Sequence, residues 1–379
     1  MRVTPDRVEA MLDDLARLVR AESPSDDLAA VADSAGVVAD IMTARLGRAP
    51  EVASVDGVHH VMLRGRDPRV LVLGHHDTVW PIGTLAELPF RVADGVITGP
   101  GTLDMKVGLV QAIHALDLVR AEIGLDAVTL LVTGDEEVGS PTSRALIEAE
   151  AARCHAALVL EPGGGGGELK IARKGTSNYR IEVEGRAAHA GLEPERGVNA
   201  AIALAGIVLA LDAIADADAG TTVTPTILAG GTTANTVPAQ AHVQVDVRAR
   251  TVGEQQRVDR AIRALTTPVR GARITVTGGP HRPPLERAAT NGLFERAGLL
   301  ADALGQTAPA GIDAGGASDG NFTGALGVPT LDGLGAVGGG PHARDEHALV
   351  GWIAPRTELL AALVVDVVRR ARPAPSRRA

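Results

Sequence analysis

The sequence predicts an α/β protein with a mostly parallel central sheet and an inserted second domain. Three short apolar runs support the sheet: RVLVLG (69–74), AVTLLVTG (127–134) and AALVLE (156–161). Nearly continuous apolar strands that alternate with helices are typical of parallel sheets covered on both faces. Farther along the chain, the order of expected elements becomes β-α-β-β-α-β, which is typical of a ferredoxin-like domain.

Helical periodicity marks the segments around the three apolar runs. Apolar residues recur at helical spacing over 5–20 and again over roughly 105–121. A last helix is expected to begin at Pro355. We therefore predict one α/β domain in two pieces, 1–175 and 284–379.

The intervening segment 176–283 is predicted to be the inserted ferredoxin-like domain. Its expected elements are, in order, SNYRIEVEG, VNAAIALAGIVLALDAI, TVTPTILAGG, AHVQVDVRAR, EQQRVDRAIRALTT and ARITVTGG. Alternation of apolar residues predicts strands in the first, third, fourth and sixth of these, and helical spacing predicts helices in the others. The run GGGGG (163–167) looks like a flexible linker, although it follows a strand too closely to mark the domain boundary.

Composition narrows the class of protein. At 379 residues with 45% hydrophobic residues the chain suits two globular domains, and a net charge of -9 argues against nucleic acid as a partner. The single cysteine, Cys154, suits a reducing compartment and is expected to be a buried thiol rather than a nucleophile. No signal sequence, membrane span or membrane partner is expected, and we predict a cytoplasmic protein with a disordered basic tail, ARPAPSRRA.

Polar side chains collect where the three expected strands end. RVLVLG leads into HHD (75–77), AVTLLVTG into DEE (135–137), and AALVL into Glu161. Open α/β sheets bind ligands at the carboxyl ends of their strands, so these groups should lie close together. Asp104, in GPGTLDMKVG at the expected start of a helix, is a further candidate.

Neighbouring side chains within these runs point in different directions, so we expect them to have different roles. In an extended segment His75 and Asp77 share one side, and His76 points away. A carboxylate beside a metal-binding histidine suits its second ring nitrogen, although a capped turn with surface histidines has the same sequence. In TGDEEVGS, one glutamate is free to bind a cation while the other is a general base; the alternative is a solvated acidic turn.

The number and kind of these groups suit a metal centre. Two histidines and three carboxylates would hold two borderline divalent ions, with zinc the first expectation and cobalt or manganese the alternatives. Asp104 would bridge the two ions. The second histidine is expected from GLGAVGGGPHARDEH, which offers His342 and His347. Glycines before His342 allow the backbone to approach a crowded site and favour that residue.

Six ordered motifs resemble those of the dizinc exopeptidases. The motifs are HHDTV (75–79), LPFRV, GPGTLDMK, GDEEVGS, Glu161-Pro162 and PHARDE. The family includes glutamate carboxypeptidase, aminoacylase, acetylornithine deacetylase and succinyl-diaminopimelate desuccinylase. The chain looks most similar to the glutamate carboxypeptidases of the carboxypeptidase G type. The resemblance covers nearly the whole chain, but Lys106-Val107-Gly108 departs from the two glycines that often follow Asp-x-Lys in the family.

The resemblance implies a role for each residue of the centre. One metal would be held by His75 and Glu161, the other by Glu137 and His342, with Asp104 bridging. It also implies that Asp77 orients His75, that Glu136 is the general base, and that the Asp104-Met105 peptide bond is cis. These carried-over roles assign to this chain the residues His75, Asp77, Asp104, Glu136, Glu137, Glu161 and His342.

The inserted segment resembles the lid domain of the same family, through which its members dimerise. The resemblance implies that His189 in AAHAG reaches the scissile carbonyl across a dimer interface and that Asn235 in TTANTVP contacts substrate. Arg282 in GGPHRPP would grip the substrate's free carboxylate, with Arg248 and Arg287 as rivals. The glycines of GGASDGN (315–321), Gly315 and Gly316, would give the substrate close access to the backbone.

The expected function is hydrolysis of an amide bond next to an amino acid that has a free carboxylate. Glu136 would take the proton of a water activated by two metals. A glutamate-carboxypeptidase-like peptidase is favoured, and an N-acyl-amino-acid deacylase is the alternative with the same machinery. A non-catalytic binding protein is the alternative of another class, but such a protein would be expected to have lost the base or a ligand first.

Overall fold

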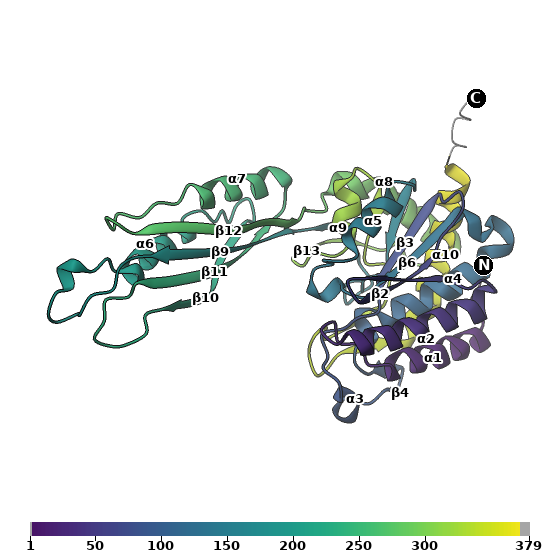
Figure 1. The fold of residues 1–379 in the computed structure, drawn as a ribbon. Helices are drawn as coiled ribbons and strands as arrows, with labels where there is room; N and C mark the ends of the chain where they lie inside the picture. Colours follow the sequence, from purple (N-terminus) through teal and green to yellow (C-terminus); the bar gives the residue numbers. More distant parts are fainter. Residues whose placement is uncertain (1, 372–379) are drawn as a thin grey trace, which may run out of the picture. The chain divides into compact units, whose positions relative to one another are not determined.

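The computed structural model describes residues 2–371 of the chain. The tail that is expected to be disordered lies, from residue 372 onward, outside the described residues. The chain divides into two compact units (Figure 1). Unit 1 comprises Met1–Ala172, Arg287–Ala314 and Ser318–Ala379, and unit 2 comprises Arg173–Glu286 with Gly315–Ala317.

Unit 1 is built on a mixed, mainly parallel sheet, as the fold class predicted. The strand order is β1-β2-β6-β3-β7-β14. Strands β6, β3, β7 and β14 run parallel, whereas β1 and β2 pair antiparallel at one edge. The bounds are β1 Glu51–Val55, β2 Val58–Leu63, β3 Val70–His75, β6 Val128–Thr133, β7 Ala156–Val159 and β14 Thr330–Leu331.

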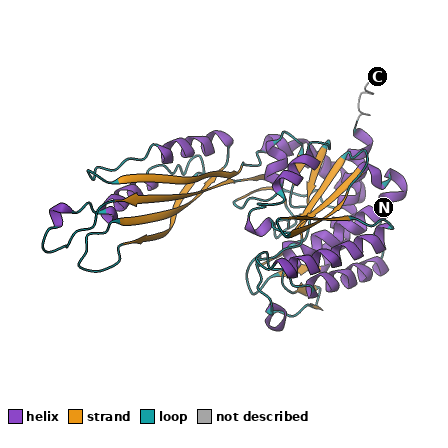
Figure 2. Ribbon diagram, in the orientation of Figure 1, coloured by secondary structure: helices purple, strands orange, loops and turns teal. Residues whose placement is uncertain are grey.

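Helices cover both faces of this sheet (Figure 2). Alternate residues of β3 belong to different cores: Val70 and Val72 join the larger core, and Leu71 and Leu73 join the smaller one. The larger core includes residues of α1 Pro5–Arg20, α2 Leu28–Leu46, α4 Val107–Ile123, α8 Arg287–Leu304 and α10 Ile353–Arg370. The smaller core includes residues of α5 Arg144–Ala151 and α9 Gly320–Ala325. Apolar side chains on both faces explain why the three strands are nearly continuous in hydrophobicity.

The antiparallel pair of β1 and β2 at the edge of the sheet was not expected, although the sequence contains a signal for the turn between them. Val55 pairs with Val58, so Asp56-Gly57 forms a two-residue turn in which both residues have positive φ, 48° and 85°. Asp-Gly is a strong signal for this kind of hairpin.

A small antiparallel sheet brings the last part of unit 1 beside residues 91–98. Its strands, in spatial order, are β15 Gly338–Gly339, β16 His347–Leu349, β5 Val96–Thr98 and β4 Arg91–Ala93. In this sheet His347 pairs with Thr98 and Leu349 with Val96. The loop that carries His342 therefore begins and ends at strands of this sheet.

Unit 2 has the β-α-β-β-α-β order of a ferredoxin-like fold. The elements are β9 Gly175–Glu184, α6 Ala200–Asp212, β10 Thr222–Gly230, β11 Gln240–Ala249, α7 Val252–Arg263 and β12 Arg273–Arg282. The sheet is antiparallel with the spatial order β10-β11-β9-β12. Unit 2 has its own hydrophobic core, to which both helices contribute, for example with Leu204 and Val258.

The pentaglycine run is a packed turn, which corrects its interpretation as a flexible linker. Gly163 donates its N–H to the carbonyl of Ala336, and Gly164 donates to that of Glu168. A Cβ at Gly163 would lie 2.1 Å from Nη2 of Arg356, and one at Gly167 would lie 2.5 Å from the ring of Trp352. Gly163 and Gly167 are thus required by neighbours that fill the space of a side chain.

Two other expectations concern single features. Among the described residues, no helix is long and apolar enough to cross a membrane. Cys154 is half-buried, and burial raises the pKa of its thiol to about 12. The thiol is therefore protonated at neutral pH and unsuited to be a nucleophile.

Candidate metal centre

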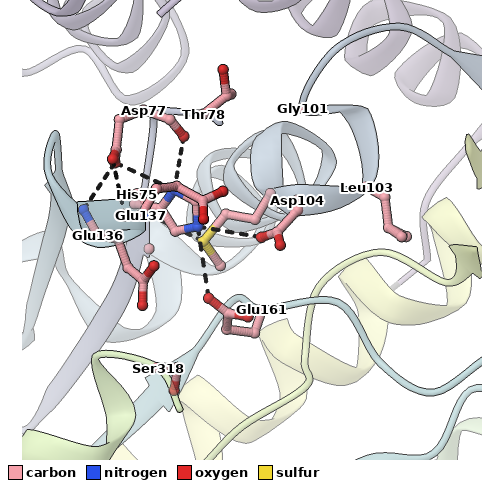
Figure 3. A network of polar contacts seen from close by, with 12 residues as sticks. His75, Asp77, Thr78, Gly101, Leu103, Asp104, Glu136, Glu137, Glu161 and Ser318 are labelled. Atoms are coloured by element: carbon pink, nitrogen blue, oxygen red, sulfur yellow. Dashed lines mark hydrogen bonds and ion pairs between the residues drawn. The ribbon is translucent and has the colours of Figure 1, made fainter. Parts of the chain in front are cut away.

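The candidate centre lies at the carboxyl ends of three neighbouring parallel strands in unit 1. Strand β3 ends at His75, which pairs with Thr133 at the end of β6, and β7 pairs with β3 on the other side. The chain continues from β6 into a short 3-10 turn at Glu136–Val138, and from β7 into Glu161. The side chains of these segments meet in Figure 3. Sheet topology alone therefore brings the three predicted runs together.

Asp104 contributes its side chain to the same cluster from a turn that precedes α4. Residues Thr102–Lys106 form a short π-helical turn that contains a cis peptide bond between Asp104 and Met105, as the resemblance implied. Gly108, the glycine retained after Lys106-Val107, is required there because a Cβ would lie 2.4 Å from the carbonyl oxygen of Leu160.

Four close pairs connect imidazole nitrogens to carboxylate oxygens. His75 Nε2 lies 3.3 Å from Asp104 Oδ1 and 3.7 Å from Glu161 Oε1. His342 Nε2 lies 3.4 Å from Asp104 Oδ2 and 3.3 Å from Glu137 Oε2. Each oxygen of Asp104 thus faces a different histidine, which is the arrangement expected of a carboxylate between two cations.

Glu136 lies in the same cluster as the five proposed ligands. Ligand atoms of His75, Glu136 and Glu161 all lie within 4.8 Å of one another, and so do those of His75, Asp104 and Glu137. Glu136 is 8% exposed. Its carboxylate is therefore close enough to share a water with a cation held by the neighbouring groups.

Asp77 is completely buried and fixes three segments at once. Its backbone carbonyl lies 3.0 Å from His75 Nδ1, and its Oδ1 lies 3.4 Å from the same nitrogen. Its Oδ1 accepts the N–H of Glu136 and its Oδ2 that of Glu137, both at 3.1 Å. Ser25 Oγ donates to Oδ2 at 2.7 Å. These bonds leave Nε2 of His75 directed at the carboxylates.

Electrostatics in the cluster favour added positive charge. Burial alone lowers the pKa of His75, but the surrounding carboxylates, with Asp104 foremost, outweigh it and hold the pKa well above its usual value. Hydrogen bonds that His342 donates to the carboxylates of Asp104 and Glu137 raise its pKa to about 10. Burial raises the pKa of Glu137. A divalent cation among these groups would satisfy the same excess of negative charge.

Unpartnered atoms point to the same place. Among the described residues, His75 Nε2, Asp104 Oδ1 and Glu137 Oε1 are buried without meeting the geometry of a hydrogen bond, although the first two atoms face each other at 3.3 Å. Buried polar atoms normally have partners, and unpartnered ones call for an explanation such as an ion. Nitrogen and carboxylate oxygen are the donors that zinc, cobalt and manganese accept, so these residues fit a divalent metal centre.

The remaining residues of the strand-end runs support the loops. His76 points away from the cluster and is buried between Ser34 Oγ, 3.2 Å from its Nδ1, and the carbonyl of His59, 3.0 Å from its Nε2. Burial lowers the pKa of His76 to about 4, so the ring is neutral. Asp135 accepts hydrogen bonds from the backbone and hydroxyl groups of Thr142 and Ser143. It shapes the turn that presents the two glutamates.

Of the two late histidines, His342 is the one that reaches the cluster. Its φ of 60° places it in the left-handed region, and it follows Gly340, which has φ 71°. His347 lies in β16 with its Nδ1 2.8 Å from the carbonyl of Asp345. None of the ion pairs of the described residues joins His347 to the cluster.

The predicted lid residues His189 and Asn235 lie side by side within unit 2. His189 pairs with Thr236, and the N–H of Ala190 donates to the carbonyl of Asn235 at 2.8 Å. Both residues are exposed, so His189 is not a core histidine. Its Nδ1 accepts the N–H groups of Gly191 and Leu192, both at 3.1 Å. The neutral ring therefore carries its proton on Nε2 and offers a donor there.

Arg282 and the two glycines also belong to unit 2. Arg282 is 7% exposed at the end of β12, and its carbonyl accepts a hydrogen bond from Gln255 Nε2. Among the other candidate arginines, Arg248 donates to both oxygens of Asp246, and Arg287 donates to Oδ1 of Asp313.

Gly315 and Gly316 have open space beside them. No atom of the described residues lies within 4 Å of a Cβ built at either glycine. The carbonyl of Gly316 accepts a hydrogen bond from Arg173 Nη1 at 3.1 Å.

Two buried carboxylates near the centre were not singled out from the sequence. Glu346 is 0% exposed and accepts the backbone N–H groups of Gly101, Leu103 and Asp104. Burial raises the pKa of Glu346. Asp319 is 3% exposed; it accepts the hydroxyl groups of Ser140 and, at 3.2 Å, of Thr133. A carboxylate in a loop gives no signal of its own, because its role depends on the backbone that it meets.

Comparison with known proteins identifies the family. Residues 71–366 match Peptidase family M20/M25/M40. The chain is 30% identical over 382 residues to Carboxypeptidase G2 of Pseudomonas sp. (strain RS-16), covering 96% of this chain and 90% of the relative. It is 29% identical over 306 residues to a succinyl-diaminopimelate desuccinylase of Methylorubrum extorquens, covering 75% of this chain and 78% of the relative.

A solved structure agrees in fold. The aminopeptidase PepT of Bacillus cereus ATCC 10987 superposes with a TM-score of 0.75 at 23% identity, covering 95% of this chain and 98% of the other. With the match to the family over most of its length, the chain belongs to Peptidase family M20/M25/M40 and is a metal-dependent amide hydrolase.

Proposed function

We propose that this enzyme is a glutamate-carboxypeptidase-like metallopeptidase, which hydrolyses the amide bond next to an amino acid with a free carboxylate. The observation that carries the proposal is the cluster of His75, Asp104, Glu137, Glu161 and His342, with unpartnered nitrogen and oxygen atoms at its centre. The likeness to a carboxypeptidase over nearly the full chain supports the choice of reaction.

The centre is proposed to hold two divalent ions, zinc in the first place and cobalt or manganese as alternatives. His75 and Glu161 would bind one ion, and Glu137 and His342 the other. Asp104 would bridge them, which is supported by the distances of its two oxygens, 3.3 and 3.4 Å, from the two imidazoles. When bound, the ions supply an electrophile for the carbonyl oxygen and lower the pKa of water.

Glu136 is proposed to move the proton. It takes a proton from the attacking water and passes it to the amine that leaves, so that a neutral amine is released. Asp77 supports this role because its carboxylate accepts the N–H of Glu136 and so fixes the backbone from which the base extends. It also orients His75 through the second ring nitrogen.

The proposed substrate contacts come from unit 2. His189 would donate from Nε2 to the oxyanion that develops on the scissile carbonyl, and Asn235 would contact substrate beside it. Arg282 would bind the free carboxylate, because a guanidinium group matches both carboxylate oxygens. Gly315 and Gly316 would present backbone to the substrate.

Unit 2 is also proposed to form a homodimer interface. Large apolar side chains are exposed on α6 and in the segment that precedes it in the chain, among them Leu192 at 76%, Ile202 at 64% and Leu209 at 75%. Ile227 and Leu228 are exposed at 52% and 53% on the edge strand β10. Exposed apolar side chains and an edge strand are both typical of an interface between subunits. The single cysteine is consistent with a cytoplasmic enzyme.

An N-acyl-amino-acid deacylase is the second candidate. The specific observation in its favour is the likeness to the desuccinylase over 75% of the chain. Both reactions use the same metal centre, base and carboxylate contact, so the difference lies in the group on the other side of the amide bond.

A product assay distinguishes the two candidates. The purified enzyme, loaded in turn with zinc, cobalt or manganese, is incubated with a mixed library of dipeptides, folate-like glutamate conjugates and acyl amino acids. We expect mass spectrometry to detect release of a C-terminal amino acid, glutamate above others. Release of acetate or succinate from acyl amino acids alone would favour the deacylase, and no hydrolysis with any metal would reject both.

A further inference from the structure

The carboxylate of Glu346 connects the loop that carries His342 to the turn that carries Asp104, and each of its two oxygens accepts two hydrogen bonds. Its Oε1 accepts the N–H of Leu103 at 2.9 Å and that of Asp104 at 3.2 Å. Its Oε2 accepts the N–H of Gly101 at 3.1 Å and the indole Nε1–H of Trp80 at 2.6 Å. The side chain is 0% exposed; its bonds to Gly101 and Leu103 are buried, and those to Trp80 and Asp104 are partly buried.

The backbone around Glu346 is placed independently of its carboxylate. Strand β16 begins at the next residue, His347, and pairs with β5, which ends at Thr98 just before the turn. Glu346 itself follows His342 by four positions in the chain. The short sheet thus brings the two loops together, and the carboxylate then decides how the turn is oriented.

The bond to the N–H of Asp104 bears directly on the direction of that side chain. An N–H donor in a buried hydrogen bond fixes the plane of the peptide group that precedes Asp104. From that backbone the two oxygens of Asp104 reach His75 at 3.3 Å and His342 at 3.4 Å. A small rotation of the turn would withdraw at least one oxygen from its imidazole.

We propose that Glu346 is the positioning residue of the centre: it holds the Asp104 turn and the His342 loop in the one register in which Asp104 serves both metal positions. This inference rests on the proposed metal centre and adds a residue to it that touches neither metal nor substrate. It assigns to Glu346 an effect on metal binding, beyond the stability that any buried carboxylate with hydrogen-bond partners provides.

The nature of the side chain makes the inference testable with conservative variants. Both oxygens of a carboxylate accept, whereas the amide of glutamine accepts on one side and presents an N–H group to donors on the other. Glu346→Gln therefore breaks two of the four bonds, because the NH2 group of the amide then faces the two N–H donors that one carboxylate oxygen accepted. Glu346→Asp keeps the charge but shortens the reach, and Trp80→Phe removes one bond while leaving the carboxylate in place.

Glu358 provides a matched control in unit 1. It is 5% exposed, and its Oε1 accepts the backbone N–H of Val3 at 2.8 Å. It belongs to α10 and shares no contact with the metal cluster among those that the described residues make. Glu358→Gln therefore reports what the loss of a buried carboxylate does to stability alone.

The experiment is a titration of the full-length, metal-free protein and its variants with cobalt, in which the d–d absorption of the bound ion reports binding. Thermal unfolding, kcat and KM are measured in parallel. In Glu346→Gln we expect cobalt affinity at least about tenfold weaker and a changed absorption spectrum, as for other residues that orient ligands. At saturating cobalt, kcat should fall while KM changes little. Trp80→Phe should show a smaller loss of the same kind, and Glu358→Gln a lower Tm with an unchanged spectrum and cobalt isotherm.

The outcomes separate this inference from the proposed centre. Wild-type protein that binds cobalt, together with a folded Glu346→Gln variant whose isotherm and spectrum match it, would overturn the role of Glu346 alone. If Glu346→Gln does not fold, Glu346→Asp and Trp80→Phe decide, and wild-type spectra in both overturn it equally. Wild-type protein that binds no cobalt would overturn the metal centre and this inference with it.

Discussion

The carboxylate of Asp77 accepts the backbone N–H of Glu136 at 3.1 Å, and the same buried side chain lies against Nδ1 of His75. One residue therefore sets both the direction of a proposed ligand and the position of the proposed base. This arrangement explains how a run of acidic residues is held at the end of a buried strand. Its backbone is fixed by the carboxylate of Asp77 on one side, and the side chains of Glu136 and Glu137 join the cluster around His75 on the other.

Asp77→Asn is expected to weaken metal binding and activity without abolishing metal binding. The amide presents a donor to the N–H of Glu136 or Glu137, so one of these two bonds is lost. Loss of a residue that orients ligands costs about 10–100-fold in metal affinity or activity. Zinc titration and kcat at saturating zinc measure the two effects. A variant with wild-type values of both would show that Asp77 has no orienting role.

Glu136→Ala should separate binding from chemistry. Because the proposed ligands remain, the variant is expected to bind metal like the wild type while the rate of the chemical step falls by at least about a hundredfold. Single-turnover kinetics and metal analysis after dialysis provide the measurements. Glu87→Gln, at an exposed position of the short helix α3 Thr84–Glu87, is the control and should retain full activity. Wild-type turnover in Glu136→Ala would discard the assignment of the base.

His342→Ala and His347→Ala form a matched pair of histidine variants. His342 Nε2 faces Asp104 and Glu137, whereas His347 meets the carbonyl of Asp345. We expect His342→Ala to retain less metal after dialysis and to lose most activity, and His347→Ala to resemble the wild type in both. The reverse ranking would move the ligand to His347.

Asp14 should make stability depend on pH far from the centre. It accepts a hydrogen bond from Arg45 Nε at 2.7 Å and lies 2.8 Å from His114 Nε2. Burial raises the pKa of Asp14, but His114 and Arg45 outweigh it, so the pKa lies below its usual value of 3.8. A carboxyl group with a lowered folded-state pKa stabilises the fold above its unfolded pKa, and this contribution is lost as pH falls through the folded pKa.

Asp14→Asn is therefore expected to lower the free energy of unfolding by about 1.5–3 kcal/mol at neutral pH, the range for hydrogen bonds to charged groups. The difference from wild type should be constant between about pH 8 and pH 5 and shrink below about pH 4. Denaturant unfolding at several pH values measures it. A difference that grows on acidification would contradict the sign.

Two glycines of the pentaglycine turn should differ in how much their substitution by alanine destabilises the protein. Gly167 has φ 87°, and a Cβ there would lie 2.5 Å from the ring of Trp352, so Gly167→Ala is expected to cost about 1–3 kcal/mol. A Cβ at Gly165 would meet its nearest atom, the carbonyl oxygen of Gly338, at 3.9 Å. Gly165→Ala should therefore change the free energy of unfolding by less than about 0.5 kcal/mol. Equal effects of the two substitutions would restore the interpretation of the run as a flexible linker.

Residues at strand ends were accessible from sequence because two local patterns coincide. A continuous apolar run predicts a buried parallel strand, and the polar residues directly after it must lie at the edge of the sheet where ligands bind. His75, Glu136 and Glu161 are all placed in this way. The two-residue alternation also gave the outward direction of His76, which the structure confirms.

The other parts of the site depend on contacts that no local pattern announces. Glu346 is one acid in HARDEH, and its partners lie 242 or more positions away in the chain. Its position follows from the pairing of β16 with β5, strands of three residues each, which is too short for periodicity to be visible. The pentaglycine turn is the converse case. Its composition is that of a linker, but it packs against residues far along the chain, among them Ala336, Trp352 and Arg356.

The long segment of unit 2, Arg173–Glu286, begins and ends at residues that face each other. The N–H of Arg173 donates to the carbonyl of Leu285 at 2.9 Å, and the N–H of Leu285 donates back at 3.0 Å. A tight turn in place of the residues between them would join the same two ends, which is the geometry in which whole domains are gained or lost without disturbing their host. The proposed metal centre and the proposed substrate contacts thus belong to different compact units of one chain, and the long segment of the second unit could be exchanged as a whole.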